Sequence, residues 1–187
     1  MGKFYITTAI DYANGAPHIG HALEKIQADV LARYRRQKND SVFFLTGTDE
    51  HGAKNVKAAE KAGKTPQELV DENYAKFYAL KNLLNLSFDD FIRTSDQQRH
   101  WPAAQKIWLK LFEAGDLYRK KYRGLYCVGH EAFITEKDLV EEKCIDHQTA
   151  PEIIEEENWF FRLSRYSQKI GKIIKSDELK IIPETRK

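Results

Sequence analysis

The sequence is poor in cysteine, in net charge and in long apolar runs. Two cysteines among 187 residues are too few for a scaffold held by disulfides. No apolar run approaches the roughly 20 residues of a membrane span, and cleavage of a signal peptide would remove the polar stretch at residues 7–21. A net charge of +2 gives no strong signal for nucleic-acid binding. We therefore expect a cytoplasmic protein with no membrane partner.

Apolar material is nevertheless sufficient for a folded core. Hydrophobic residues make up 42% of the chain and aromatic residues 12%, which is typical of a globular protein. At 187 residues the length allows one domain, or one domain and a smaller second one.

Residues 7–21, TTAIDYANGAPHIGH, are the most informative stretch. They follow a short apolar run at residues 4–6 that is typical of a strand. Asn14 and Gly15 then predict a turn, and Pro17 is suited to the first turn of a helix because it has no backbone N–H to satisfy. The pattern predicts a strand, a turn and the start of a helix.

His18 and His21 are three residues apart, so they share one face of that first helical turn. Gly20 between them has no side chain, which lets a ligand approach the backbone closely. The N–H groups of a helix N-terminus attract phosphate, and two imidazoles beside them are suited to stabilising charge during phosphate chemistry. The alternative is a pair of ordinary surface histidines.

A second polar stretch, residues 46–52, follows a second predicted strand at residues 42–45, a continuous apolar run typical of a strand buried on both faces. Apolar residues at helical spacing in residues 19–38 predict a helix between the two strands. Ligands of open α/β sheets bind beyond the carboxyl ends of strands, so the two polar stretches should form one pocket. Asp49 there is suited to an ammonium group; alternatively, Asp49 and Glu50 favour the start of the next helix.

Residues 1–114 are predicted to have the order β-α-β-α-α-β-α, half of a doubly wound parallel sheet. Two capping boxes, at residues 65–68 and 95–98, mark helix starts, and residues 88–93 predict a strand. Gly115 is suited to ending the last helix. The predicted buried face of that helix comprises Trp101, Ala104, Ile107 or Trp108, Leu111 and Phe112.

Both cysteines fall in C-x-x-H pairs, Cys127 with His130 and Cys144 with His147, separated by 13 residues. Two thiolates and two imidazoles are the ligand set of a closed tetrahedral zinc site, which leaves no open position for catalysis. The spacing therefore predicts a structural zinc ion. The alternative is two buried cysteines and two surface histidines that match by coincidence.

Residues 117–127 are predicted to be extended segments around a basic turn, and residues 152–163 a further strand. The basic, aromatic residues 118–126 are suited to RNA, since cationic side chains bind phosphate and aromatic rings stack on bases. The alternative is a solvated hairpin.

The segments AIDYANGAPHIGHA (residues 9–22) and GTDEHG (residues 47–52) resemble the methionyl-tRNA synthetases among the class I aminoacyl-tRNA synthetases. The first contains an intact HIGH signature; HxGH nucleotidyltransferases share a looser version of it. The resemblance implies the first half of a Rossmann-like, HUP-type parallel sheet with an inserted connective subdomain that carries a zinc knuckle. It implies domains at residues 1–114 and 115–187.

The resemblance also implies a methionine–tRNA ligase, which activates methionine with ATP and Mg²⁺ and transfers it to tRNA(Met). His18 and His21 match the catalytic, ATP-binding histidines, with Pro17 and Gly20 beside them in the ATP site. Asp49 matches the carboxylate that binds the methionine ammonium group. The other positions of the methionine pocket are Ala9, Ile10 and Tyr12, and the family often has a different residue at Asp11.

Several parts of such an enzyme are missing from the sequence. No KMSKS loop is present, since the only methionine is Met1, and no second half of the Rossmann fold or anticodon-binding domain follows. We therefore expect a fragment that has the C-terminal half as a partner and exposes an open sheet edge and apolar surface. Two alternatives stay open: another class I synthetase or HxGH nucleotidyltransferase, and a non-catalytic zinc module that binds tRNA or a partner chain.

Overall fold

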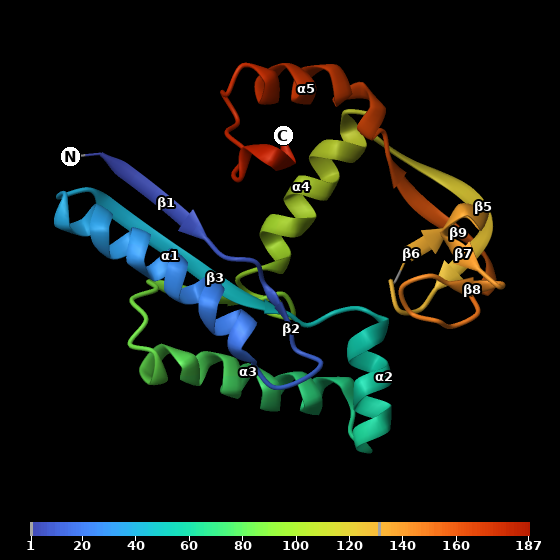
Figure 1. The fold of residues 1–187 in the computed structure, drawn as a ribbon, viewed down its shortest axis with the longest axis horizontal. Coiled ribbons are helices and arrows are strands. Elements are labelled where there is room, and N and C mark those ends of the chain that lie inside the picture. The colour runs from blue at the N-terminus through green and yellow to red at the C-terminus, as the bar shows by residue number, and fades with distance from the viewer. Residues whose placement is uncertain (1, 131) are drawn as a thin grey trace. The chain divides into compact units, whose positions relative to one another are not determined.

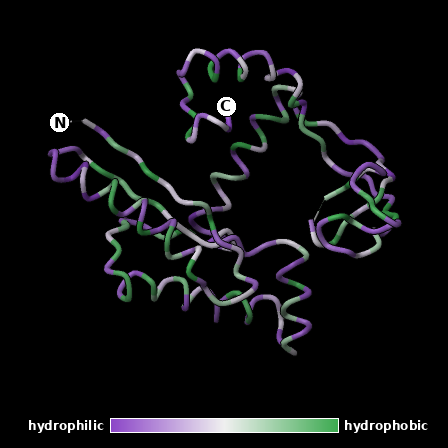
Figure 2. Tube along the Cα trace, viewed as in Figure 1, coloured by the Kyte–Doolittle hydropathy of each residue, from purple (hydrophilic) through white to green (hydrophobic). Residues whose placement is uncertain are grey.

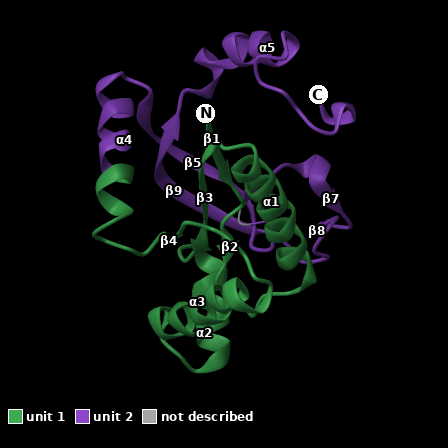
Figure 3. Cartoon of the chain, turned by 90° about the vertical axis from the view of Figure 1, so that its left-hand side faces the viewer, with its two compact units in different colours: residues 1–104 green, residues 105–187 purple. Residues whose placement is uncertain are grey.

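The computed structural model describes residues 2–130 and 132–187. The chain forms two compact units, residues 1–104 and residues 105–187 (Figure 3). Within the described residues, no helix is both long and apolar enough to cross a membrane. The functional division expected between residues 114 and 115 stays a prediction.

The first unit is built around strand β3 (Ser41–Asp49) (Figure 1). Three strands pair with β3, all in parallel: β1 (Lys3–Thr7), β2 (Asp11–Tyr12) and β4 (Asp90–Arg93). The mixed α/β fold with a parallel sheet is confirmed. Strand β2 was not predicted, because two residues are too short to show a period.

Three helices of the first unit follow the predicted order, but the first of them begins at Ile19, so Pro17 lies before its N-cap and not in its first turn. They are α1 (Ile19–Gln37), α2 (Ala53–Ala62) and α3 (Pro66–Leu83). Gly63 ends α2 with a φ of 66°, a left-handed conformation that suits glycine. The backbone N–H of Glu68 donates to Oγ of Thr65 at 3.2 Å, as the predicted capping box requires.

Helix α1 turns a partly polar face toward the core. Lys25, Ala28, Asp29 and Ala32 are buried, whereas the apolar residues at helical spacing, including Ile19, are exposed. The inward charges have partners: Asp29 accepts from Arg33 at 2.6 Å and from the N–H of Ser87 at 2.6 Å. The core cluster comprises Ala28, Ala32, Phe44, Phe77, Leu80, Leu86, Phe88 and Phe91.

The expected burial of residues 42–45 on both faces of the sheet is wrong. Phe44 is fully buried, but Phe43 on the opposite face is 46% exposed and stacks on Tyr5, which is 62% exposed. Burial on both faces would require a second covering layer. The first unit therefore exposes apolar surface on this sheet face and on α1, as expected for half of a doubly wound sheet.

Helix α4 (Trp101–Glu113) differs from the expectation at its start and along its length. The carboxylate of Asp96, and not the Ser95 hydroxyl, accepts from the N–H groups of Gln98 and Arg99, both at 2.9 Å. Hydrophobic positions recur along α4 in Figure 2, yet none of its residues is buried. An apolar stripe predicts which face of a helix can pack, but not that a partner covers it.

The second unit contains a three-stranded antiparallel sheet in which β5 (Leu117–Cys127) pairs with β9 (Glu152–Phe161) and β6 (Ala132–Ile134). The expected basic turn within residues 117–127 is wrong, because β5 is continuous. Its basic residues lie beside acidic ones of β9: Arg119 pairs with Glu157 at 2.6 Å. The second unit also contains β7 (Leu139–Val140), β8 (Lys143–Cys144) and α5 (Ser167–Lys175).

Gly47→Ala is expected to destabilise the first unit by about 1–3 kcal/mol, the usual cost of overpacking. A Cβ at position 47 would lie 2.2 Å from the carbonyl oxygen of Ile92, where β3 and β4 meet. Urea denaturation measures the change. Gly15→Ala is the matched control, because a Cβ there meets no atom within 4 Å. Equal unfolding midpoints for the two variants would contradict the prediction.

Candidate functional site

The HIGH turn forms the N-terminal cap of α1. His18 is the N-cap residue; its Nδ1 accepts from the N–H of Gly20 at 3.1 Å, and Nδ1 of His21 accepts from the N–H of His18 at 3.1 Å. The two imidazoles stack, with centroids 3.7 Å apart. Because both Nδ1 atoms accept hydrogen bonds, each neutral ring carries its proton on Nε2. Two N–H donors are thereby fixed beside the start of a long helix.

Gly20 leaves room for the ring of His18. A Cβ at position 20 would lie 3.0 Å from Cε1 of His18, so a larger residue would displace the capping imidazole. Glycine therefore allows His18 to fold over the first turn of the helix, in addition to leaving the backbone open.

His21 lies in a partly buried position. Its ring contacts the edge of Phe77, with centroids 5.2 Å apart, and its side chain is 23% exposed. Burial lowers the pKa of His21, although the nearby carboxylate of Asp11 opposes the shift. His21 is therefore a neutral N–H donor near pH 7.

A buried ion pair beside the HIGH turn was not predicted. The ammonium group of Lys25, 1% exposed, donates to the carboxylate of Asp11, 5% exposed. Oδ1 of the same carboxylate lies 3.8 Å from Nε2 of His21. The sequence held two signals of this contact: Lys25 lies on the inward face of α1, and Asp11 stands where the family often has a different residue. Neither signal identifies the partner.

The residues expected in a methionine pocket lie along β2 and the loop before it. Tyr12 stands opposite Asp49 in the parallel pairing of β2 with β3. The N–H of Ala9 donates to Glu24 at 2.6 Å, and Ile10 is 43% exposed. The structure thus brings Tyr12 and Asp49 together at the carboxyl ends of the strands, next to the HIGH turn.

Glu50 does not cap α2, contrary to the alternative considered above. The N-cap of α2 is Gly52, with no side-chain hydrogen bond. Glu50 is buried, and its carboxylate accepts from Thr48 and Arg93, both at 2.7 Å. Because Arg93 lies in β4, this long-range pair fixes the end of β3 that carries Asp49.

The second unit brings the four predicted metal ligands together, with their ligand atoms within 4.8 Å of one another. Nδ1 of His130 lies 3.4 Å from Sγ of Cys144, and Nδ1 of His147 lies 3.6 Å from that sulfur and 3.7 Å from Sγ of Cys127. Bonds of about 2.3 Å to sulfur and 2.0–2.1 Å to nitrogen in a tetrahedron give an N···S distance of about 3.6 Å. The four residues therefore fit a zinc ion.

The Cys127 turn also favours a thiolate. The backbone N–H of His130 donates toward the Cys127 sulfur and lowers the pKa of the thiol. Thiolate is the form that binds metals. Cys127 and Cys144 are buried, whereas His130 and His147 are on the surface.

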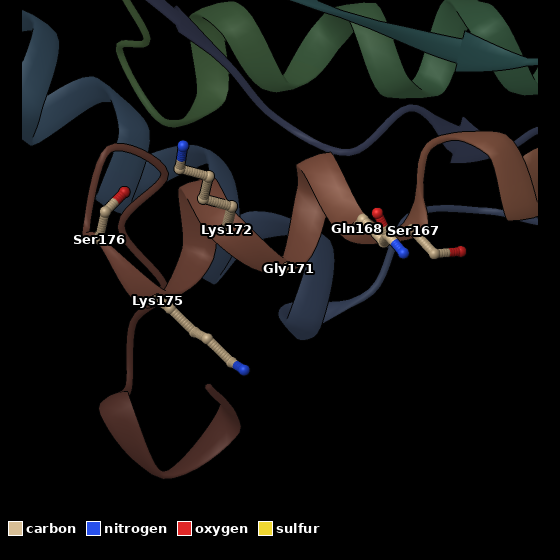
Figure 4. A pocket seen from close by; sticks show the side chains of 6 residues that line it. All are labelled: Ser167, Gln168, Gly171, Lys172, Lys175 and Ser176. Carbon is tan, nitrogen blue, oxygen red and sulfur yellow. The ribbon is translucent and has the colours of Figure 1, made fainter.

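A hollow of about 610 Å³ on α5 contains none of the predicted site residues. In Figure 4 the ammonium groups of Lys172 and Lys175 point in different directions, so the hollow does not concentrate positive charge. We assign no function to it. The residues that line it are Ser167, Gln168, Gly171, Lys172, Lys175 and Ser176.

Comparison with known proteins decides the family. The family described as tRNA synthetases class I (M) matches residues 4–144. The chain belongs to this family of class I tRNA synthetases. The match covers both the HIGH turn and the β3 end that carries Asp49, so the two stretches of the first unit are parts of one synthetase fold.

Individual relatives of this synthetase chain agree. It is 50% identical to the methionine–tRNA ligase of Rhizobium meliloti (strain 1021), over 90% of this chain and 33% of that protein. It is 44% identical to the methionine–tRNA ligase of Brucella suis biovar 1, over 99% of this chain and 36% of that protein. The chain thus spans about a third of the length of these relatives.

A solved structure of another synthetase is similar to this chain over its whole length. Mycobacterium tuberculosis methionyl-tRNA synthetase in complex with methionyl-adenylate matches with a TM-score of 0.92 and 42% identity. The match covers 100% of this synthetase chain and 37% of the other.

Proposed function

We propose that this chain carries the amino-acid activation site of a methionine–tRNA ligase. The reaction joins methionine and ATP to give methionyl-adenylate and pyrophosphate, and methionine then passes to tRNA(Met). The observation that carries the proposal is the juxtaposition of two neutral imidazole donors at a helix start with Asp49 at the end of β3. The adenylate bound in the similar M. tuberculosis structure supports it.

We assign the ATP phosphates to the start of α1, at Pro17, His18, Gly20 and His21. The methionine carboxylate attacks the α-phosphorus and pyrophosphate leaves, so no protein nucleophile is needed. The Nε2–H groups of His18 and His21 donate to the charge that develops on the phosphates, which is where fixed donors have their largest effect. Mg²⁺ supplies further charge neutralisation when it is bound with ATP.

Methionine is assigned to the neighbouring edge of the pocket. The Asp49 carboxylate, half-buried at the end of β3, binds the ammonium group. The ammonium–carboxylate contact orients the substrate carboxylate toward ATP. Ala9, Ile10 and Tyr12 contact the side chain and set its selectivity.

We further assign a structural Zn²⁺ to Cys127, His130, Cys144 and His147, in a connective subdomain at residues 115–187. Four protein ligands close the coordination shell, so the ion stabilises the fold and takes no part in adenylation. The expected partners of residues 1–187 are tRNA(Met) and a C-terminal half that corresponds to the rest of the relatives' sequence. RNA contact by residues 118–126 stays a prediction.

Methionine-dependent ATP–pyrophosphate exchange tests the activity. We expect exchange with methionine, and not with leucine or valine, when the chain is combined with a polypeptide that supplies the remaining length of its relatives. Exchange by the chain alone would show that these residues suffice for adenylation. A folded chain that gives no exchange in either form, or exchange that follows another amino acid, would overturn the proposal.

His21→Ala should reduce the exchange rate by about 100- to 1,000-fold, the usual cost of losing one fixed donor to a transition state. Methionine binding, measured by calorimetry, should change little, since His21 is assigned to phosphate. His21→Gln retains an N–H donor and should lose less. A rate unchanged in His21→Ala would reject the assigned role.

A further inference from the structure

The two histidines of the metal cluster are positioned in different ways. Nε2 of His130 lies 3.0 Å from Oδ2 of Asp146, a residue within the second C-x-x-H segment. His147 instead packs against backbone, since a Cβ at Gly129 would lie 2.3 Å from its Cδ2. The edge of one imidazole meets the other, with centroids 4.4 Å apart.

The Asp146 contact fixes the tautomer of His130. A carboxylate oxygen accepts, so Nε2 carries the proton and donates to Asp146. Nδ1 is then left with its lone pair directed toward Cys144, 3.4 Å away. This is the form in which a neutral imidazole binds a metal, and a carboxylate behind a ligating histidine both orients the ring and increases its basicity.

We propose that Asp146 is a positioning residue for the zinc site: it holds His130 with Nδ1 toward the ion and links the two C-x-x-H turns. The proposal rests on the zinc site assigned above. The connection crosses the cluster, because Asp146 comes from the turn that supplies Cys144 and His147, whereas His130 comes from the turn that supplies Cys127. This hydrogen bond therefore joins the two turns, in addition to the packing of His147 against Gly129.

The exposure of the Asp146 side chain limits how much its removal should weaken zinc binding. Partners behind metal ligands typically change affinity by about 10- to 100-fold. The side chain of Asp146 is 65% exposed, and water competes for the hydrogen bond. We therefore expect Asp146→Ala to weaken zinc binding by about tenfold, at the lower end of that range.

Zinc affinity, measured by competition with a chelating dye at fixed pH, tests the role on the full chain. Asp146→Ala should bind zinc about tenfold more weakly, and Asp146→Asn, which retains an acceptor oxygen, should lose less. Glu178→Ala is the matched control, because it removes the same charge from an exposed position in the same unit. Its affinity should equal that of the unaltered chain.

A second background separates positioning of His130 from a general effect of charge. In His130→Cys, a thiolate replaces the imidazole and needs no carboxylate behind it, so adding Asp146→Ala should leave zinc affinity unchanged. An equal loss in both backgrounds would overturn the positioning role. So would unchanged affinity in Asp146→Ala alone. Absence of zinc binding by the unaltered chain would overturn the metal site itself, and this role with it.

The tautomer gives a readout that does not depend on affinity. In a long-range ¹H–¹⁵N spectrum of the zinc-loaded chain, His130 should show a protonated Nε2 and a metal-bound Nδ1. The Nε2 proton should exchange with water faster in Asp146→Ala. Metal bound through Nε2 of His130 would contradict the proposal.

Discussion

Cys144→Ser is expected to weaken zinc binding by about 100- to 1,000-fold. Structural zinc sites bind with about 10–16 kcal/mol at pH 7. Loss of one of four ligands, taken as a quarter of that energy, raises the dissociation constant for zinc by about two to three factors of ten. The sulfur of Cys144 lies within 3.6 Å of Nδ1 of both His130 and His147, so the substitution removes a group that contacts both imidazoles. Competition with a chelating dye measures the affinity, and Co²⁺ absorption reports the number of thiolates.

Loss of the metal should also unfold the turns that carry the ligands. Hydrogen exchange of the zinc-loaded chain with and without a chelator should show lost protection around β7 and β8, while β3 in the first unit keeps its protection. His147→Ala should act like Cys144→Ser, whereas His51→Ala, outside the cluster, is the control. Zinc affinity that is the same in Cys144→Ser and the unaltered chain would contradict the assignment.

Lys25→Met is expected to destabilise the first unit by about 3–5 kcal/mol, the usual cost of leaving one member of a buried ion pair without its partner. The Asp11 carboxylate is 5% exposed, and Lys25 is its ammonium partner. Methionine has a similar length, so the loss reflects charge more than volume. Urea denaturation measures the change in the free energy of unfolding.

The double variant separates the pair from its surroundings. Asp11→Asn combined with Lys25→Met removes both charges, and replacement of a whole buried pair is often close to neutral. We expect the double variant to recover most of the stability that Lys25→Met loses. A double variant as unstable as the sum of the single ones would show that the two residues do not act as a pair.

Features that depend on a few neighbouring residues were predictable from the sequence. The capping box at residues 65–68 and the spacing of His18 and His21 each involve residues within one helical turn. The two C-x-x-H pairs likewise predicted that four side chains able to bind a metal come together, because a short turn can direct both of its residues to one side. The parallel strands followed from two apolar runs with a helix between them.

Hydrophobic periodicity predicted burial wrongly for helices whose apolar face is not covered by another element. In α1 the apolar residues at helical spacing are exposed, while Lys25 and Asp29 point inward. In α4 no residue of the predicted buried stripe is buried, and only Leu111 is half-buried. A hydrophobic pattern identifies a face, but burial also depends on which other elements are present and which polar groups find partners.

The order of the longer elements of the first unit, the capping box that begins α3 and the two C-x-x-H pairs whose side chains come together could all be read from the sequence alone. The fold was needed to show that Asp11 meets Lys25, that Glu50 meets Arg93, and that Asp146 lies behind His130. These contacts join residues 14, 43 and 16 positions apart. A buried or ligand-supporting charge is stable only beside a partner, and the fold of the chain brings that partner to it.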